Sequence, residues 1–234
     1  KDPKDAVISL QRLSELRPQD PAARADLAKA QREAGDLQGA IATIGEARKL
    51  DPNNIGLAVR EVLLLGERNP DEGVAAAQRL ASQMPDQPQA QALEGDYQQS
   101  LKHPAEALAA YKKAFQAHPS LLLATRMSGM SLRAGKQDEA GQILKDWLAN
   151  HPDDAASRVA LGDTYLAMNR LDEAAAQYTE SIRATADNPI AENNLAWVLM
   201  KQGKGTEALD HAQKAAKLDP QSAEVMETLG MVLL

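Results

Sequence analysis

The side chains that most often perform catalysis or bind metals are dispersed along this chain. It contains no cysteine, which excludes disulfide bonds, thiolate metal ligands and a cysteine nucleophile. Its four histidines are His103, His118, His151 and His211. They fall in different segments, at positions where we expect turns or helix ends. His118 and His151 each precede a proline, so we expect them to cap helix ends or face solvent rather than bind a metal.

Two further patterns resemble parts of catalytic sites. The acidic pairs Asp138-Glu139 and Asp172-Glu173 could serve as proton donors and acceptors, but each stands at the start of a predicted helix. The positive end of the helix dipole favours carboxylates there. Residues 203–206 read GKGT, but they lack the spacing of the G-x-x-x-x-G-K-[ST] phosphate loop and lie in an expected turn. We therefore predict no catalytic residue, no metal site and no cofactor.

The composition restricts the possible partners. The net charge is −7, from 26 basic and 33 acidic residues, and the basic residues alternate with acidic ones. Nucleic-acid binding needs a basic stripe that neutralises phosphates, so this charge pattern argues against it. No run of about 18 apolar residues is present, so we predict no direct membrane insertion. The absence of cysteine is compatible with an oxidising periplasm.

A repeated pattern accounts for most of the chain. In the segment 155–188, Leu161, Gly162 and Tyr165 share one face of a predicted helix. A turn follows, and then a second amphipathic helix of similar length. The segments 21–54 and 189–222 align with this one without a gap, so the period is 34 residues. Helices this short are not stable alone in water, so each must bury its apolar stripe against a neighbour.

The repeat has small residues at its eighth and twentieth positions, larger side chains at the eleventh and twenty-fourth, and in most copies a proline at or near position 32. We expect the small residues to let two helix backbones approach closely, and the proline to end the second helix. This pattern resembles the tetratricopeptide repeat along the whole chain. The resemblance implies an all-α fold in which helix-turn-helix repeats stack into a right-handed superhelix, or solenoid.

The alignment predicts the following organisation. We expect repeats at 21–54, 55–87, 88–121, 122–154, 155–188 and 189–222, flanked by a second helix alone in 1–20 and a first helix alone in 223–234. The copy at 55–87 is degenerate, and its first helix is expected to be shorter or shifted. The copy at 122–154 lacks one residue, which we assign to its first helix. The last residues are apolar, which predicts that the array is truncated.

The resemblance implies a non-catalytic scaffold that binds a peptide or helix of a partner protein in a concave groove lined by the first helices. Carrying over the family's inward-facing positions gives a polar, small-residue groove early in the chain, including Lys29 and Arg32, and an apolar groove late in the chain. The predicted partner-binding residues are Val159, Asp163, Leu166, Ile190, Asn193, Asn194, Trp197, Met200 and Met231. Asn193 and Asn194 would offer amide hydrogen bonds to the bound segment. The alternative is that Trp197 and Met200 are ordinary core residues packed between helices.

One ligand class of the family can be tested on the sequence. Its carboxylate clamp needs a lysine and two asparagines at set positions of neighbouring first helices, with basic residues on the next helix. Here only Asn194 matches, while Asp163 and Glu224 would repel a carboxylate. We therefore expect that this clamp is absent.

The cellular location is predicted from two sequence segments near the end of the chain. NNLAWVLMKQG and METLGMVLL resemble the C-terminal repeats of large bacterial proteins of exopolysaccharide export and exosortase (PEP-CTERM) sorting systems. This resemblance implies a periplasmic protein or an outer-membrane-anchored lipoprotein. The alternative is a regulatory or substrate-recruiting arm of an enzyme whose catalytic domain lies elsewhere. Homo-oligomerisation through exposed terminal helices is a further possibility.

Overall fold

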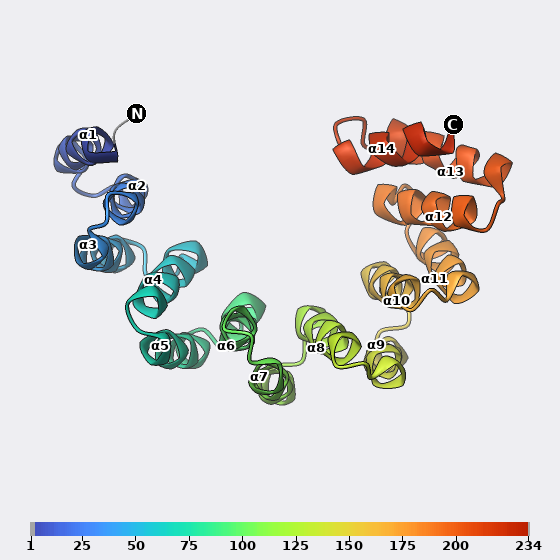
Figure 1. The fold of residues 1–234 in the computed structure, drawn as a ribbon, viewed down its shortest axis with the longest axis horizontal. Coiled ribbons are helices and arrows are strands. Elements are labelled where there is room, and N and C mark those ends of the chain that lie inside the picture. The colour runs from blue at the N-terminus through green and yellow to red at the C-terminus, as the bar shows by residue number, and fades with distance from the viewer. Residues whose placement is uncertain (1–2, 234) are drawn as a thin grey trace. The chain divides into compact units, whose positions relative to one another are not determined.

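The computed structural model describes residues 3–233, which form helices joined by short turns and contain no strand. The all-α fold predicted from the sequence is confirmed. The chain divides into two compact units, residues 1–123 and 124–234, and the division falls within one helix, α8. Within each unit, successive helices pack side by side in chain order (Figure 1).

The first unit contains seven helices in its described part and the start of an eighth. Their bounds are α1 Pro3–Leu16, α2 Pro21–Glu33, α3 Leu37–Leu50, α4 Ile55–Arg68, α5 Pro70–Gln83, α6 Pro88–Ser100, α7 Pro104–Ala117 and α8 Leu121–Arg133. The first helix of one predicted repeat also meets the first helix of the next, because α4 contacts α6. The first helices therefore form a layer of their own beside the second helices.

The second unit continues the same arrangement from the remainder of α8. Its other helices are α9 Gln137–Asn150, α10 Ala155–Ala167, α11 Leu171–Ala184, α12 Pro189–Lys201, α13 Gly205–Leu218 and α14 Ala223–Val232. Here α12 contacts both α10 and α14 across the intervening second helices. The acidic pairs noted in the sequence lie in the first turns of α9 and α11, as predicted.

In five of the six predicted repeats, the turn between the two helices contains a residue with a positive φ: Gly35, Lys102, Gly135, Asn169 or Gly203. The residue that follows the first helix and its cap has a positive φ, and glycine fills this position at Gly35, Gly135 and Gly203. Asn169 adopts the same conformation in the turn between α10 and α11. Glycine has no Cβ to clash in this region, and asparagine tolerates it better than most residues. This local requirement explains why each of these repeats contains a glycine or polar residue at that point.

Two predictions about helix length are wrong. The degenerate copy at 55–87 has a first helix of 14 residues, so α4 is not shortened. This copy is one residue shorter than the 34-residue period, and the difference lies in its turn. There Asn69 alone ends α4 and caps α5, by accepting a hydrogen bond from the amide of Asp71 at 2.9 Å. In the copy at 122–154 the first helix, α8, keeps 13 residues and begins at Leu121. The missing residue is in the preceding loop, because a surface loop loses a residue more easily than a packed helix.

The core is built from the small and large positions of the repeat. In the second unit, Ala174, Tyr178 and Ser181 of α11 are fully buried. Ser181 occupies a position that is usually alanine, and its hydroxyl is satisfied by donating to the carbonyl of Ala155 at 2.9 Å. Burying a hydroxyl is tolerated when it finds an acceptor in this way.

The small residues of the repeat were predicted to let two helix backbones approach closely, and this holds at only some of them. At Gly73 a Cβ would lie 2.6 Å from the Cα of Gly66, so the backbones of α4 and α5 do approach closely. At Gly162 the space is filled instead by a ring: a Cβ there would lie 2.5 Å from Cε1 of Tyr178. Gly95 has the same relation to Tyr111, at 2.3 Å. In the two repeats with tyrosine at position 24, the glycine therefore accommodates a large side chain rather than a neighbouring backbone.

Candidate protein-interaction surfaces

The predicted partner-binding residues on α12 coincide with the part of that helix that its neighbours leave uncovered. Its buried face contains Ala191, Glu192, Leu195, Ala196, Val198 and Leu199. Ile190 is 60% exposed, and Asn193, Asn194, Trp197 and Met200 are half-buried. These residues are spaced three or four apart, so they form one stripe along the helix. Trp197 keeps access to solvent on this stripe, and Lys201 places its Nζ 4.7 Å from the centre of the indole ring.

The polar part of this surface is a hydrogen-bonded cluster that joins three helices. Oδ1 of Asp163 on α10 accepts hydrogen bonds from the Tyr178 hydroxyl at 2.7 Å and from Nδ2 of Asn194 at 3.0 Å. Burial of the carboxyl group raises the pKa of Asp163, and it outweighs the two hydrogen bonds, which act in the opposite direction. The Asn194 amide is thus engaged within the chain. On the neighbouring Asn193, Oδ1 is buried without a hydrogen-bond partner.

A hollow of about 520 Å³ lies at one end of this surface. Val159 and Ile190 contribute to its wall, together with Asp153, Asp154, Ala155, Ala156, Thr185 and Asn188. Leu166, Trp197, Met200 and Met231, all half-buried, are not part of its lining. The predicted residues therefore divide into a recessed group at this hollow and a flatter group along α10, α12 and α14. We name the two groups together the late surface.

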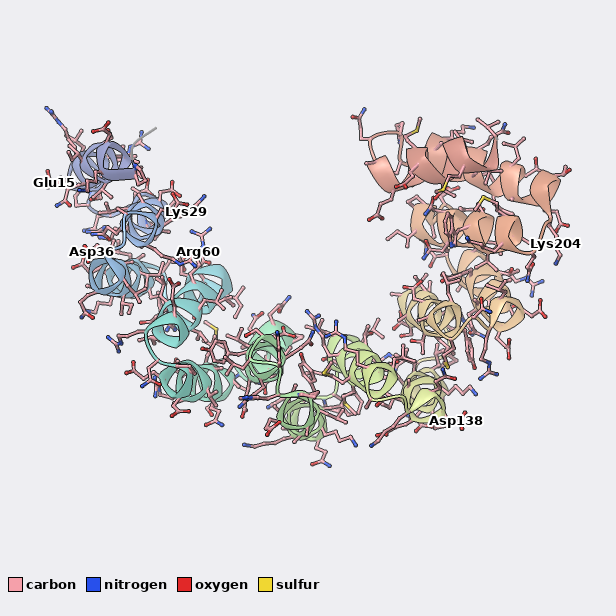
Figure 2. All side chains as sticks on the ribbon, in the orientation of Figure 1. Glu15, Lys29, Asp36, Arg60, Asp138 and Lys204 are labelled. Atoms are coloured by element: carbon pink, nitrogen blue, oxygen red, sulfur yellow. The ribbon has the colours of Figure 1, made fainter. Side chains whose placement is uncertain are left out.

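A second hollow, of about 560 Å³, lies in the first unit between α2, α4 and α6. It is lined by Ala25, Ala28, Lys29, Arg32, Ile44, Arg60, Leu63, Leu64, Gly66, Glu67 and Tyr97. We name it the early hollow. Figure 2 shows Lys29 and Arg60 extending from the same side of the α2–α4 layer, with Asp36 on the opposite side.

Sequence reasoning missed most of the early hollow. It predicted a polar, small-residue surface from Lys29 and Arg32 and assigned no inward positions to the degenerate copy at 55–87. The register of the other copies, applied to 55–87, would have pointed to Leu63, Gly66 and Glu67, all of which line the hollow. Leu63 and Gly66 of α4 and Tyr97 of α6 contribute to the apolar part of this lining.

The histidines and carboxylates stay dispersed in the described part of the folded chain. Within residues 3–233, no group of three or more histidine and acidic side chains lies close enough together to hold a metal ion. In that same range, no helix is both long and apolar enough to cross a membrane. The prediction for His211 is wrong, because it lies within α13 rather than at a helix end. Its Nδ1 contacts Oε2 of Glu192, a residue that is only 5% exposed, so this histidine has a structural role in covering a buried carboxylate.

Comparison with known families agrees with this architecture. A family model described as tetratricopeptide repeat matches residues 93–155 and 159–223, and a second model with the same description matches residues 1–60. The first model alone covers more than half of the chain. The chain belongs to the tetratricopeptide repeat family. Membership of this family supports a role in protein–protein interaction. Comparison with curated proteins found no match to this chain.

Three solved structures share the fold at low sequence identity. The yeast Tom70 structure gives a TM-score of 0.68 at 18% identity, over 98% of this chain and 51% of that one. A tetratricopeptide repeat protein from Parabacteroides merdae ATCC 43184 gives 0.60 at 18% identity, over 100% and 93%. A chain of the APC/C hetero-tetramer Cut9-Hcn1 gives 0.55 at 12% identity, over 100% and 46%. The present chain thus spans about half the length of the Tom70 and Cut9-Hcn1 chains that it matches.

Proposed function

We propose that this chain is a non-catalytic scaffold that binds a peptide or helix of a partner protein on its late surface, formed by α10, α12 and α14. The observation that carries the proposal is the uncovered stripe of α12. Five of the nine predicted residues lie on this stripe, and Trp197 is half-buried whereas six of the 13 residues of α12 are buried. Large apolar and aromatic side chains that keep solvent access are common anchors of protein interfaces.

The shape of the late surface suits an extended segment or a short helix. Val159 and Ile190 border a hollow that can receive one apolar side chain, and Trp197 and Met200 continue the apolar surface along α12. The side-chain amides of both asparagines already donate within the chain, Asn193 to Oδ1 of Asn194 at 3.4 Å and Asn194 to Oδ1 of Asp163 at 3.0 Å. Oδ1 of Asn193 is buried, so the apolar side chains rather than the asparagine amides are the proposed contacts to a partner.

The test uses peptides selected from a random 12-residue display library on the wild-type chain. Dissociation constants of the synthesised peptides are then measured by fluorescence anisotropy for wild type, Trp197→Ala and the control Leu218→Ala, which removes an exposed apolar side chain from the second helix α13. We expect Trp197→Ala to weaken binding about tenfold or more, as for an interface anchor, and Leu218→Ala to change it less than about twofold. The melting temperatures of both variants should stay close to that of wild type.

Two results would overturn this proposal. One is a set of selected peptides that all bind Trp197→Ala as tightly as wild type. The other is a large fall in the melting temperature of Trp197→Ala, which would make Trp197 a core residue.

For the cellular setting we propose the bacterial envelope, in the periplasm or on a lipid-anchored protein. The support is the resemblance of segments 193–203 and 226–234 to repeats of export and sorting proteins, together with the absence of cysteine. Fractionation of cells that carry the tagged full-length protein tests this setting, and recovery in the cytosolic fraction would contradict it.

A further inference from the structure

The early hollow combines an apolar floor with cationic edges. Ala25, Ala28, Leu64 and Tyr97 are buried residues of the floor, whereas Leu63 is 50% exposed. An exposed leucine beside a hollow of about 560 Å³ offers apolar area that a bulky side chain from a partner could cover. The floor alone does not identify that partner, so the charges around it are decisive.

The charges of the lining are unbalanced. Lys29, Arg32 and Arg60 face one acidic lining residue, Glu67, in a chain whose net charge is −7. Arg32 is paired with Glu67, Nε to Oε2 at 2.5 Å. Lys29 forms an ion pair with Glu33, which is outside the lining, Nζ to Oε1 at 4.0 Å.

Arg60 is the cation of this hollow that remains available. It has no hydrogen bond or ion pair with any residue in the range 3–233. It also borders a smaller adjacent hollow, of about 260 Å³, whose lining includes Asp26. An unpaired guanidinium at the edge of an apolar floor favours a carboxylate that arrives with an apolar neighbour.

Tyr97 places a hydrogen-bond donor in the lining of the same hollow. The residue is only 7% exposed, and its hydroxyl has no hydrogen-bond partner within the described part of the chain. Tyr111 and Tyr178, by contrast, donate to Asp96 and Asp163 at 2.6 and 2.7 Å. The Tyr97 ring lies over Gly66, where a Cβ would come within 2.1 Å of the hydroxyl oxygen, and both residues line the hollow. The Tyr97 hydroxyl oxygen is not among the fully buried polar atoms, so this donor opens onto the hollow and can donate to an acceptor that a ligand brings.

We propose that the early hollow binds an acidic segment of a partner protein that carries one bulky apolar residue. The apolar side chain covers Leu63 and enters the hollow, and flanking carboxylates pair with Arg60 and accept from the Tyr97 hydroxyl. This surface lies in the first unit and is separate from the late surface. The two proposals can therefore fail independently.

The test compares three pools of labelled hexapeptides with amidated ends. The first pool places leucine, isoleucine, methionine or phenylalanine between aspartates and glutamates. The second replaces the acids by asparagine and glutamine, and the third keeps the acids but replaces the apolar residue by serine. We expect the first pool to bind the wild-type chain about tenfold more tightly than either of the others in fluorescence anisotropy, and its affinity to fall as salt is raised.

Three variants then locate the bound peptides. Arg60→Gln and Tyr97→Phe should each weaken binding of the first pool several-fold. Lys204→Gln removes one positive charge from the second unit and is the matched control for net charge (Figure 2), so it should leave binding unchanged. Trp197→Ala should also have no effect. Tyr97→Phe should leave the melting temperature unchanged, because the lost hydroxyl has no partner within the described part of the free chain.

Each contrary result has a definite meaning. Equal binding of the acidic and amide pools would overturn the proposal, as would equal binding of the acidic pools with and without an apolar residue. Equal weakening by Arg60→Gln and Lys204→Gln would show a general effect of net charge and would also overturn it. Loss of binding in Trp197→Ala would transfer these peptides to the late surface and refute the assignment to the early hollow.

Discussion

The packing of Tyr178 against Gly162 gives the sharpest test of how these repeats are held together. In an ordinary helix interior, replacing glycine by alanine stabilises the protein by about 1 kcal/mol. Here the new methyl group would lie 2.5, 2.8 and 2.9 Å from three carbons of the Tyr178 ring. The ring is fully buried, and its hydroxyl is held by Asp163 at 2.7 Å, so it cannot retreat without breaking that hydrogen bond.

The expected magnitude follows from these opposing contributions. Overpacking a core costs about 1–3 kcal/mol, and loss of the hydrogen bond adds about 1 kcal/mol. After subtracting the gain in helix propensity, Gly162→Ala should lower the free energy of unfolding by about 1–3 kcal/mol. For a chain of this length, that corresponds to a fall in melting temperature of roughly 2–4 °C per kcal/mol.

The assay is thermal and urea unfolding followed by circular dichroism, with hydrogen exchange in α10 and α11 because repeat arrays can unfold in parts. Gly230→Ala is the matched control, because it occupies the same repeat position in α14. Apart from its chain neighbours and its own helix backbone, no described atom lies within 4 Å of the place its new methyl group would take, so it should not destabilise the chain. The double variant Gly162→Ala/Tyr178→Ile reproduces the Ala28–Ile44 pair of the first full repeat. Its free energy of unfolding should fall by less than the sum of the falls measured for the two single variants. Additive effects, or equal effects of Gly162→Ala and Gly230→Ala, would refute the reasoning.

Two further predictions concern the carboxylates of Asp163 and Glu192. The pKa of Asp163 is raised by burial above its ordinary value of 3.8, so its contribution to stability is complete below that value and declines as pH rises through the raised pKa. The melting temperature of Asp163→Asn should therefore rise relative to that of wild type as the pH is raised from about 3 to about 7. A difference in melting temperature that does not change with pH would contradict this prediction. His211→Ala leaves the carboxylate of Glu192 buried without its partner and should cost about 1–3 kcal/mol in urea unfolding, whereas replacing both residues by leucine should restore most of the loss. Equal stability of the single and double variants would contradict that account.

Much of the fold could be predicted because its signals are local. The 34-residue spacing, the turn glycines and the closing prolines each act over a few residues, and they indicated the helix pairs correctly. The two lost residues were assigned to helices instead of turns, since a gap in a sequence alignment carries no information about which neighbouring segment absorbs it. Asn69 shows the physical answer: one residue with a capping side chain can end one helix and begin the next.

The late surface was partly predictable for the same reason. Ile190, Asn193, Trp197 and Met200 follow one another at helical spacing, so their common stripe on α12 is a property of the sequence. Whether Trp197 would be covered depended on the neighbouring helices, and the sequence left that open. The structure leaves it half-buried.

Apolar spacing and turn residues act within one hairpin, so the period, the helices and the family could be predicted from the sequence. What the hairpins present to a partner depends on how they pack against one another. The early hollow needs Arg60 and Leu63 from α4, Lys29 from α2 and Tyr97 from α6 to come together, and no spacing within one helix reports that meeting. The Tyr97 hydroxyl, partnerless within residues 3–233, is likewise a consequence of packing, since Tyr111 and Tyr178 have the same chemistry but meet a carboxylate.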